Sequence, residues 1–132
     1  MSIEINLPGP HAELTAAFKR YEAALVSNDV ATLTELFAPG PHTIRYGIAE
    51  ILYGSDEIAG FRAARPAVDL ARRLSRTVIT TYGHEFGTAS TLFHRDSYGT
   101  RVGRQMQSWV RFAEGWRVVA AHVSIIPDPA RP

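Results

Sequence analysis

The chain has 132 residues, of which 45% are hydrophobic, 20% charged and 10% aromatic, and its formal net charge is +1. These values are typical of one globular domain, so we expect a single domain over residues 1–132 and no disordered or low-complexity region. The chain contains no cysteine, which excludes disulfides, thiolate nucleophiles and cysteine-containing zinc sites.

The first part of the chain predicts two helices. Apolar residues at helical spacing predict a helix over 11–27, after an extended lead-in at residues 8–10. Ser27, Asn28 and Asp29 interrupt this pattern and offer an N-cap for a second helix over 30–37. The sequence APGP then ends the second helix, because this run cannot continue it.

Residues 43–53 alternate with a period of two, which predicts one strand, or two short strands bent near Gly47. One face of a single strand would carry Ile44, Tyr46, Ile48 and Leu52, and the other would carry Thr43, Arg45, Gly47, Ala49 and Ile51. The run Ser55-Asp56-Glu57 provides a cap and an acidic first turn for a third helix, which carries Ile58 and Phe61 and ends before Pro66.

The second half of the chain predicts strands. After a stretch without a clear pattern at 67–75, four β segments follow: RTVITTYG, EFGTASTLFHR, RVGRQMQSWVRF and GWRVVAAHVSII. A glycine-containing turn at 96–100 and a tight hairpin at 113–115 connect the last three of them. This order predicts the α+β class, with helices packed on one face of a curved antiparallel sheet.

Arginine supplies every basic side chain except Lys19, and Arg45 is the most informative of them. Its strand neighbours Gly47 and Ala49 are small, which would leave room for a ligand if this face points inward. A buried arginine without an anion is costly, so an inward Arg45 predicts an anionic ligand or an acidic partner such as Glu50. An Arg45 that faces solvent is the alternative.

Two further groups have both a structural and a functional interpretation. Tyr21 lies in the apolar stripe of the first helix, either as a core aromatic or as a phenol that donates to a carbonyl or oxyanion. Arg62 and Arg65 lie at the end of the third helix, where cations favour the helix dipole. Pro66 holds the backbone of Arg65 extended, which makes Arg65 a second, weaker candidate for anion binding.

Gln105, Gln107 and Trp109 share one strand face, where inward amides would bind a urea-like or carboxylate group. An exposed position for the glutamines is the alternative. Val118, Ala120, His122 and Ser124 are expected on one side of the last strand. His122 and Ser124 have no orienting acid, so we do not expect a catalytic triad.

Several function classes have no support in the sequence. The five histidines lack metal-binding spacing, and no phosphate-binding loop occurs, so we expect neither a metal nor a cofactor. Basic residues do not cluster with aromatic residues as in nucleic-acid-binding proteins. The first ten residues carry an acid and no apolar run, and no stretch is long enough to span a membrane, so we expect a cytoplasmic protein.

The whole chain resembles a known group. The segments FKRYEAAL, TIRYG, YGSDEI, FRAARP, TYGHEFG and GRQMQSWVRFAEGWRVVAAHVS resemble the small bacterial AtzH-like group, which includes the oxalurate-catabolism protein HpxZ. This group is part of the superfamily of nuclear transport factor 2, ketosteroid isomerase and SnoaL-type proteins. The resemblance implies a cone-shaped sheet capped by helices, and a homodimer or homotetramer formed through the outer sheet face.

The resemblance also implies a role in the bacterial catabolism of ureido compounds, such as oxalurate and cyanuric acid degradation. Members of the group are connected with hydrolysis of 1,3-dicarboxyurea to allophanate, beside separate amidases that are possible partners. In ketosteroid isomerases, a tyrosine on the first helix donates to an oxyanion, and Tyr21 has the matching position. Those isomerases also use a carboxylate base, and Glu50 alone offers a candidate here.

The leading hypothesis is a cofactor-free enzyme that acts on a small anionic ureido substrate, with Tyr21 and Arg45 as catalytic residues. Arg45 would hold a substrate carboxylate, and Tyr21 would polarise the adjacent carbonyl or give a proton to the leaving nitrogen. Arg65, Gln107 and Trp109 are the expected substrate-binding residues. The alternatives are a non-enzymatic carboxylate-binding subunit that partners an amidase, and an isomerase or dehydratase with Glu50 or His122 as base.

Overall fold

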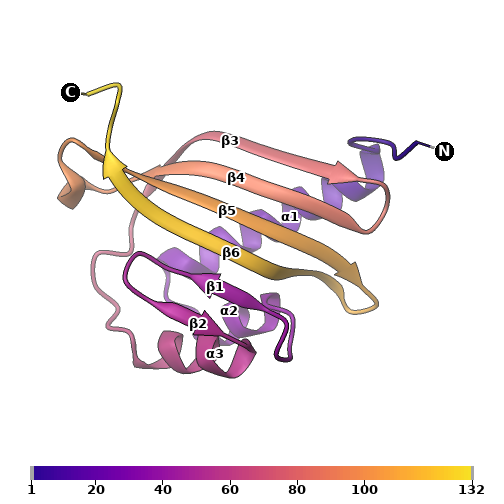
Figure 1. Cartoon of the computed structure of the whole chain (residues 1–132), viewed down its shortest axis with the longest axis horizontal. Helices are drawn as coiled ribbons and strands as arrows, with labels where there is room; N and C mark the ends of the chain where they lie inside the picture. Colours follow the sequence, from indigo (N-terminus) through magenta and orange to yellow (C-terminus); the bar gives the residue numbers. More distant parts are fainter. Residues whose placement is uncertain (1, 132) are drawn as a thin grey trace.

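The computed structural model describes residues 2–131, and it has two layers, with helices packed on one face of a curved, open sheet (Figure 1). The sheet order is β2-β1-β6-β5-β4-β3. The elements in chain order are α1 (Pro8–Val26), α2 (Val30–Leu36), β1 (Ile44–Tyr46), β2 (Ile51–Tyr53), α3 (Ser55–Ala64), β3 (Arg73–Tyr82), β4 (Phe86–His94), a 3₁₀ turn (Asp96–Tyr98), β5 (Arg101–Phe112) and β6 (Gly115–Pro127). The α+β class expected from the sequence is confirmed.

The three helices lie where the sequence predicts them, and two details of how they begin differ from the prediction. The extended lead-in expected at residues 8–10 is wrong, since α1 begins at Pro8, where the fixed φ of proline suits the first helical turn. The cap expected from Ser55 is also wrong, because its hydroxyl accepts a bond from the amide of Gly40 (2.8 Å). The N-cap of α2 is Asp29, whose carboxylate accepts a hydrogen bond from the amide of Thr32 (3.2 Å).

The period-two segment forms a hairpin of two short strands, β1 and β2, bent after Tyr46. Arg45 pairs with Leu52, and both side chains are buried on the inner face. The expected grouping of Leu52 with Ile44, and of Ile51 with Arg45, is therefore wrong. The four residues between the strands reset the alternation, so even positions of β2 share the inner face with odd positions of β1.

A bulge changes the faces of the last strand in the same way. Ser108 pairs with Ala120 and Trp109 pairs with Val118, which leaves Val119 as the additional residue on β6. Val118 is buried on the inner face, whereas Ala120 and His122 are exposed. The expectation that Val118 shares a face with Ala120, His122 and Ser124 is wrong for this reason.

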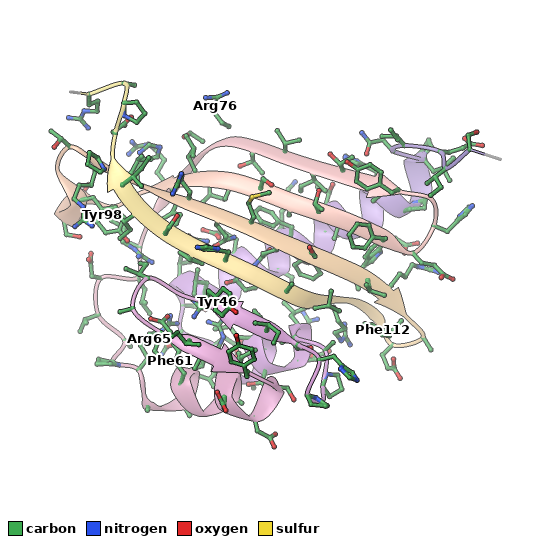
Figure 2. The ribbon with its side chains drawn as sticks, viewed as in Figure 1. Tyr46, Phe61, Arg65, Arg76, Tyr98 and Phe112 are labelled. Atoms are coloured by element: carbon green, nitrogen blue, oxygen red, sulfur yellow. The ribbon has the colours of Figure 1, made fainter. Side chains whose placement is uncertain are left out.

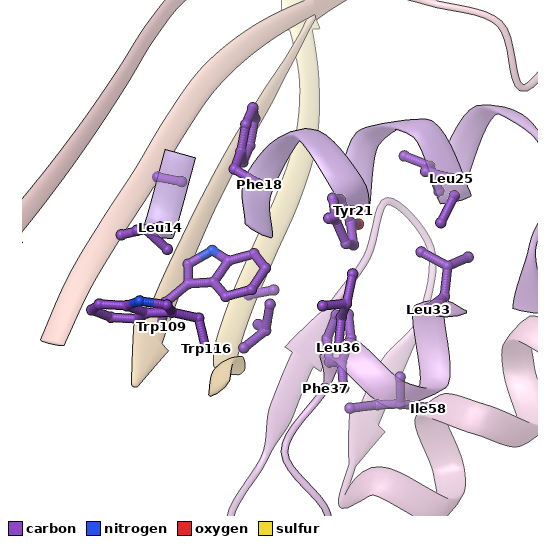
Figure 3. Close-up of a cluster of buried hydrophobic side chains, with 14 of the residues drawn as sticks. Leu14, Phe18, Tyr21, Leu25, Leu33, Leu36, Phe37, Ile58, Trp109 and Trp116 are labelled. Carbon is purple, nitrogen blue, oxygen red and sulfur yellow. The ribbon is translucent and has the colours of Figure 1, made fainter. Parts of the chain in front are cut away.

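The hydrophobic core fills the space between α1, α2, α3 and the concave face of the sheet. Its largest apolar side chain, Trp109, meets the ring of Tyr21 edge-on, with the ring centroids 6.5 Å apart (Figure 3). Leu14 and Phe18 of α1 pack beside these two rings. Within residues 2–131, no helix is both long enough and apolar enough to cross a membrane.

Candidate anion-binding site

A cavity of about 310 Å³ opens at the end of the sheet where the β1–β2 turn, the end of α3 and the last residues of β4 meet. The residues that line it are Leu25, Arg45, Ile48, Glu50, Phe61, Arg65, Pro66, Val68, Asp69, Leu70, Phe93, Arg95 and Val123. Three cations and two carboxylates therefore share this small volume with apolar side chains. Such a lining is typical of a pocket that orients a small polar ligand.

Two phenylalanine rings hold four arginines in place around this cavity. The guanidinium carbons of Arg45 and Arg65 lie 5.6 and 5.9 Å from the centroid of Phe61. Figure 2 shows Phe61 and Arg65 next to each other at the end of α3. Arg72 and Arg95 lie in the same relation to Phe93, at 4.6 and 5.4 Å. Cation–π contacts thus orient the guanidinium groups without neutralising them.

Arg45 points inward, as the functional interpretation of the sequence required. It is 6% exposed, and its Nη1 donates to Oε1 of Glu50 at 2.8 Å. The second carboxylate oxygen of Glu50 accepts a bond from the amide of Ala49 (3.0 Å). The Nε of Arg45 is buried and has no hydrogen-bond partner among residues 2–131. Glu50 is therefore the acidic partner expected from the sequence, and Arg45 retains a free donor.

Arg62 is the functional candidate that sequence reasoning missed. Its side chain is fully buried (0% exposed), and none of its three guanidinium nitrogens has a hydrogen-bond partner within the described residues. The group lies 5.0 Å from the ring centroid of Phe37 and 5.9 Å from that of Tyr21. Burial lowers the pKa of Arg62 from its usual range, and the charge of Arg45 adds to this effect, while the neighbouring Tyr21 hydroxyl and Glu50 oppose it.

Tyr21 belongs to α1 and lies behind the cavity, with its side chain only 2% exposed. Figure 3 shows its hydroxyl oxygen on the side of Leu25, a residue that lines the cavity. Burial raises the pKa of Tyr21, but the charges of Arg62, Arg45 and Arg72 together lower it by more. The net result is a phenol with a pKa below its ordinary value of about 10. Such a phenol is a better proton donor than a free tyrosine.

Arg65 follows the last residue of α3, and its backbone is extended (φ −73°, ψ 132°), as expected for a residue before proline. Its side chain lines the cavity, with buried Nε and Nη2 atoms that lack a partner among residues 2–131. Burial lowers the pKa of Arg65, and the charges of Arg62 and Arg45 lower it further. The structure therefore brings Arg45 and Arg65 to one cavity.

Gln105, Gln107 and Trp109 are buried on the inner face, as one interpretation of the sequence required. They do not line the cavity. The indole Nε1 of Trp109 donates to Oε1 of Gln107 (3.0 Å), and Oε1 of Gln105 accepts from Arg72 (3.0 Å). Each glutamine keeps a buried amide nitrogen without a partner in residues 2–131. These side chains form the packed layer behind Tyr21.

The charges around the cavity do not balance. Arg72 is paired with Glu22, at 2.8 Å from its Nε, and Arg45 is paired with Glu50. Asp69 accepts a bond from the hydroxyl of Ser97 (2.6 Å). The positive side chains are Arg45, Arg62, Arg65, Arg72 and Arg95, and the negative ones are Glu22, Glu50 and Asp69. The site therefore has an excess of two positive charges.

The remaining candidates lie elsewhere or make other contacts. His122 lies on the outer face of the sheet, where its ring meets that of Tyr46 edge-on at 6.1 Å. Glu50 lines the cavity, but its carboxylate is bound to Arg45. Within residues 2–131, no three histidine or acidic side chains gather closely enough to hold a metal ion.

A family model described as AtzH-like matches residues 3–129, which is almost the whole chain. The chain belongs to the AtzH-like family. No curated protein matches its sequence.

Solved structures place this AtzH-like chain among proteins of one fold. A protein of unknown function from Pectobacterium atrosepticum is 56% identical, with a TM-score of 0.90, over 92% of this chain and 94% of that one. A cystatin-like fold protein from Burkholderia xenovorans is 46% identical, with a TM-score of 0.92, over 97% of this chain and all of that one.

A more distant solved structure has a similar fold. A ketosteroid isomerase-like protein from Erwinia carotovora atroseptica is 15% identical, with a TM-score of 0.71, over 91% of this chain and 98% of that one. At this identity the likeness concerns the fold alone. The AtzH-like chain therefore has the nuclear transport factor 2-like fold expected from its motifs.

Proposed function

We propose that the chain is a cofactor-free amidohydrolase that acts on a small carboxylated urea of the 1,3-dicarboxyurea type. The observation that carries this proposal is the set of buried, unpartnered guanidinium nitrogens on Arg45, Arg62, Arg65 and Arg95. Buried donors without acceptors are costly, so a protein that keeps seven of them around one site has a use for an acceptor-rich ligand. A carboxylate offers two oxygens to the planar arginine fork.

In the proposed reaction, water adds to a terminal carboxyl carbon, and the bond from that carbon to the urea nitrogen breaks. The nitrogen gains one proton, and the products from dicarboxyurea and water are allophanate and bicarbonate. Arg45 holds the terminal carboxylate, and the acidified Tyr21 gives the proton to the leaving nitrogen and regains one from the attacking water. The same arginine charge stabilises the negative charge that develops on oxygen.

The test compares dicarboxyurea turnover by the unaltered chain, by Tyr21→Phe and by Arg45→Ala, with circular dichroism to confirm folding. Loss of the phenol proton should lower kcat about 10²-fold or more, and loss of Arg45 should raise KM and lower kcat. Because Tyr21 must be protonated to act as an acid, activity should fall as the pH rises through its pKa, which lies below 10. The Tyr21→Phe variant should lack this alkaline decrease.

Two results would refute the proposal. Unchanged turnover by both variants would show that neither residue takes part in the chemistry. Ligand-induced thermal stabilisation of the unaltered chain by carboxylates, without any turnover, would favour a carboxylate-binding subunit that partners an amidase.

A further inference from the structure

Aliphatic side chains form a large part of the cavity wall. The rings of Phe61 and Phe93 have a role there, since they hold the arginines. Five aliphatic residues also line the cavity, and they are Leu25 of α1, Val123 of β6, Ile48 of the β1–β2 turn, and Val68 and Leu70 of the loop between α3 and β3. Two loops, one helix and one strand therefore bring apolar surface to the same cavity as the arginines.

Two of these aliphatic side chains are largely exposed to solvent. Ile48 is 50% exposed and Val68 is 70% exposed, although they belong to different loops. Both line the cavity that the buried Leu25 and Val123 also line. Single exposed apolar residues are ordinary on a protein surface, but exposed aliphatic surface that continues into a cavity is typical of a ligand-binding groove.

The carboxylated urea of the proposed reaction leaves this aliphatic surface unused. Every hydrogen atom of 1,3-dicarboxyurea is bound to nitrogen or oxygen, so the molecule has no C–H group to pack against leucine, isoleucine or valine. The cavity of about 310 Å³ has the volume of about ten water molecules in the liquid, at about 30 Å³ each. Dicarboxyurea has about ten non-hydrogen atoms, and covalent bonds hold them closer together than separate water molecules. The cavity is therefore larger and more apolar than this substrate requires.

We propose that the cavity also binds carboxylates that carry a short aliphatic chain, with the carboxylate at Arg45 and Arg65 and the chain against Ile48, Val68 and Leu70. The inference goes beyond the proposed function, because it concerns binding alone and requires no reaction. Nε of Arg45 and Nε and Nη2 of Arg65 are buried without partners within residues 2–131, so they are available to a carboxylate. The bound chain gains free energy because its own surface and that of the exposed loop residues leave water.

The charges in the cavity select the head group of such a ligand. Arg45, Arg65 and Arg95 line the cavity and outnumber the two carboxylates there, Glu50 and Asp69. Glu50 is bound to Arg45, and Asp69 accepts a bond from the Ser97 hydroxyl. An aliphatic amine would add a fourth cation, and an alcohol would leave the guanidinium charges unpaired. A carboxylate is the head group that fits.

The test measures dissociation constants by titration calorimetry for acetate, propionate, butyrate and pentanoate. The unaltered chain should bind each acid about two- to fourfold more tightly than the next shorter one, as expected for a methylene group that moves from water to an apolar surface. 1-Pentanol and pentylamine should bind at least tenfold more weakly than pentanoate. Malonate should displace pentanoate, because the two ligands use the same arginines.

A pair of matched variants locates the aliphatic chain. Ile48→Ser/Val68→Ser alters two exposed loop residues outside the helices and strands, so the fold should be retained. This variant should bind acetate within about threefold of the unaltered chain and lose half or more of the gain from acetate to pentanoate. Ile51→Ser/Val78→Ser is the control, because it alters an exposed isoleucine and an exposed valine that do not line the cavity. The control should keep the gain.

Equal binding of the four acids by the unaltered chain would overturn the inference. Full retention of the chain-length gain by Ile48→Ser/Val68→Ser would do the same, and so would an equal loss in the control. The proposed function can fail separately. A chain that binds pentanoate as expected but never hydrolyses dicarboxyurea refutes the reaction and retains the inference. Hydrolysis of dicarboxyurea without any chain-length gain refutes the inference and retains the reaction.

Discussion

Replacement of Arg62 by methionine should stabilise the protein in a buffer without anions, while it impairs the site. Methionine fills a similar elongated volume with an apolar side chain and has no N–H group to satisfy. Arg62 is fully buried with three unpartnered nitrogens, and burial lowers its pKa, which means that its charged form is disfavoured there. The substitution therefore removes an unfavourable contribution to the free energy of folding.

The magnitude follows from two opposing effects. One unsatisfied buried donor costs about 1–3 kcal/mol, and a buried charged group costs more. The substitution also removes the cation–π contacts with Phe37 and Tyr21, each worth about 0.5–2 kcal/mol. The net stabilisation is about 1–4 kcal/mol, within the range found when buried ionic groups are replaced by apolar ones. For a chain of this length, 1 kcal/mol corresponds to about 3–5 °C in Tm.

The assay is thermal unfolding followed by circular dichroism in a buffer free of carboxylate, phosphate and sulfate, then repeated with added malonate. The expected result is a higher Tm for Arg62→Met than for the unaltered chain without malonate, and a smaller malonate-dependent increase in Tm for Arg62→Met than for the unaltered chain. Arg104→Met, which alters an exposed arginine on the outer face of the sheet, is the control and should have the Tm of the unaltered chain in both conditions. An Arg62→Met variant that is less stable than the unaltered chain without anions would refute the reasoning, because the guanidinium would then be satisfied within the fold.

Two further substitutions test the buried side chains that hold the site in place. Alanine at Gly103 should destabilise the fold by about 1–3 kcal/mol and weaken carboxylate binding, because its Cβ would overlap the ring of Phe93, which holds Arg72 and Arg95. Urea unfolding and malonate titration measure the two effects, and unchanged binding would contradict the role of Phe93. Leucine at Gln107 should cost about 1–3 kcal/mol in urea unfolding, since the buried Nε1 of Trp109 loses its acceptor. A Gln107→Leu variant with unaltered stability and weaker malonate binding would instead indicate direct ligand contact.

A local sequence pattern offers the inward position of Arg45 as one of two alternatives, whereas the positions of its neighbours depend on turn geometry. Small residues beside Arg45 indicate space around it, and that information is present in five consecutive residues. The face of Leu52 depends on how many residues the turn after Tyr46 contains, and the face of Ala120 depends on the bulge at Val119. A single-residue change in register reverses every later side chain, which periodicity alone does not reveal.

Arg62 shows a different limit of sequence reasoning. An arginine in the last turn of a helix is explained by the helix dipole, so its presence there carries no further information. The available signal is its spacing, because Arg62 lies four positions after Ile58, which is buried on the same helix. A cation in the apolar stripe of an amphipathic helix indicates a buried charge. For Gln107, the alternation along the strand offers the inward face as one of two alternatives, but it does not reveal the bond from Trp109 to its side-chain oxygen.

The two phenylalanines explain how an almost neutral protein keeps free arginines ready for an anion. Arg65 and Arg95 are held against the rings of Phe61 and Phe93, and their Nε atoms remain without partners within residues 2–131. An aromatic ring contacts the flat face of a guanidinium, whereas a carboxylate binds its N–H edge. The incoming anion therefore breaks no ion pair at these two arginines and immobilises no flexible side chain. Such preorganisation lowers the cost of binding, and it lets a small cavity bind a small anion selectively.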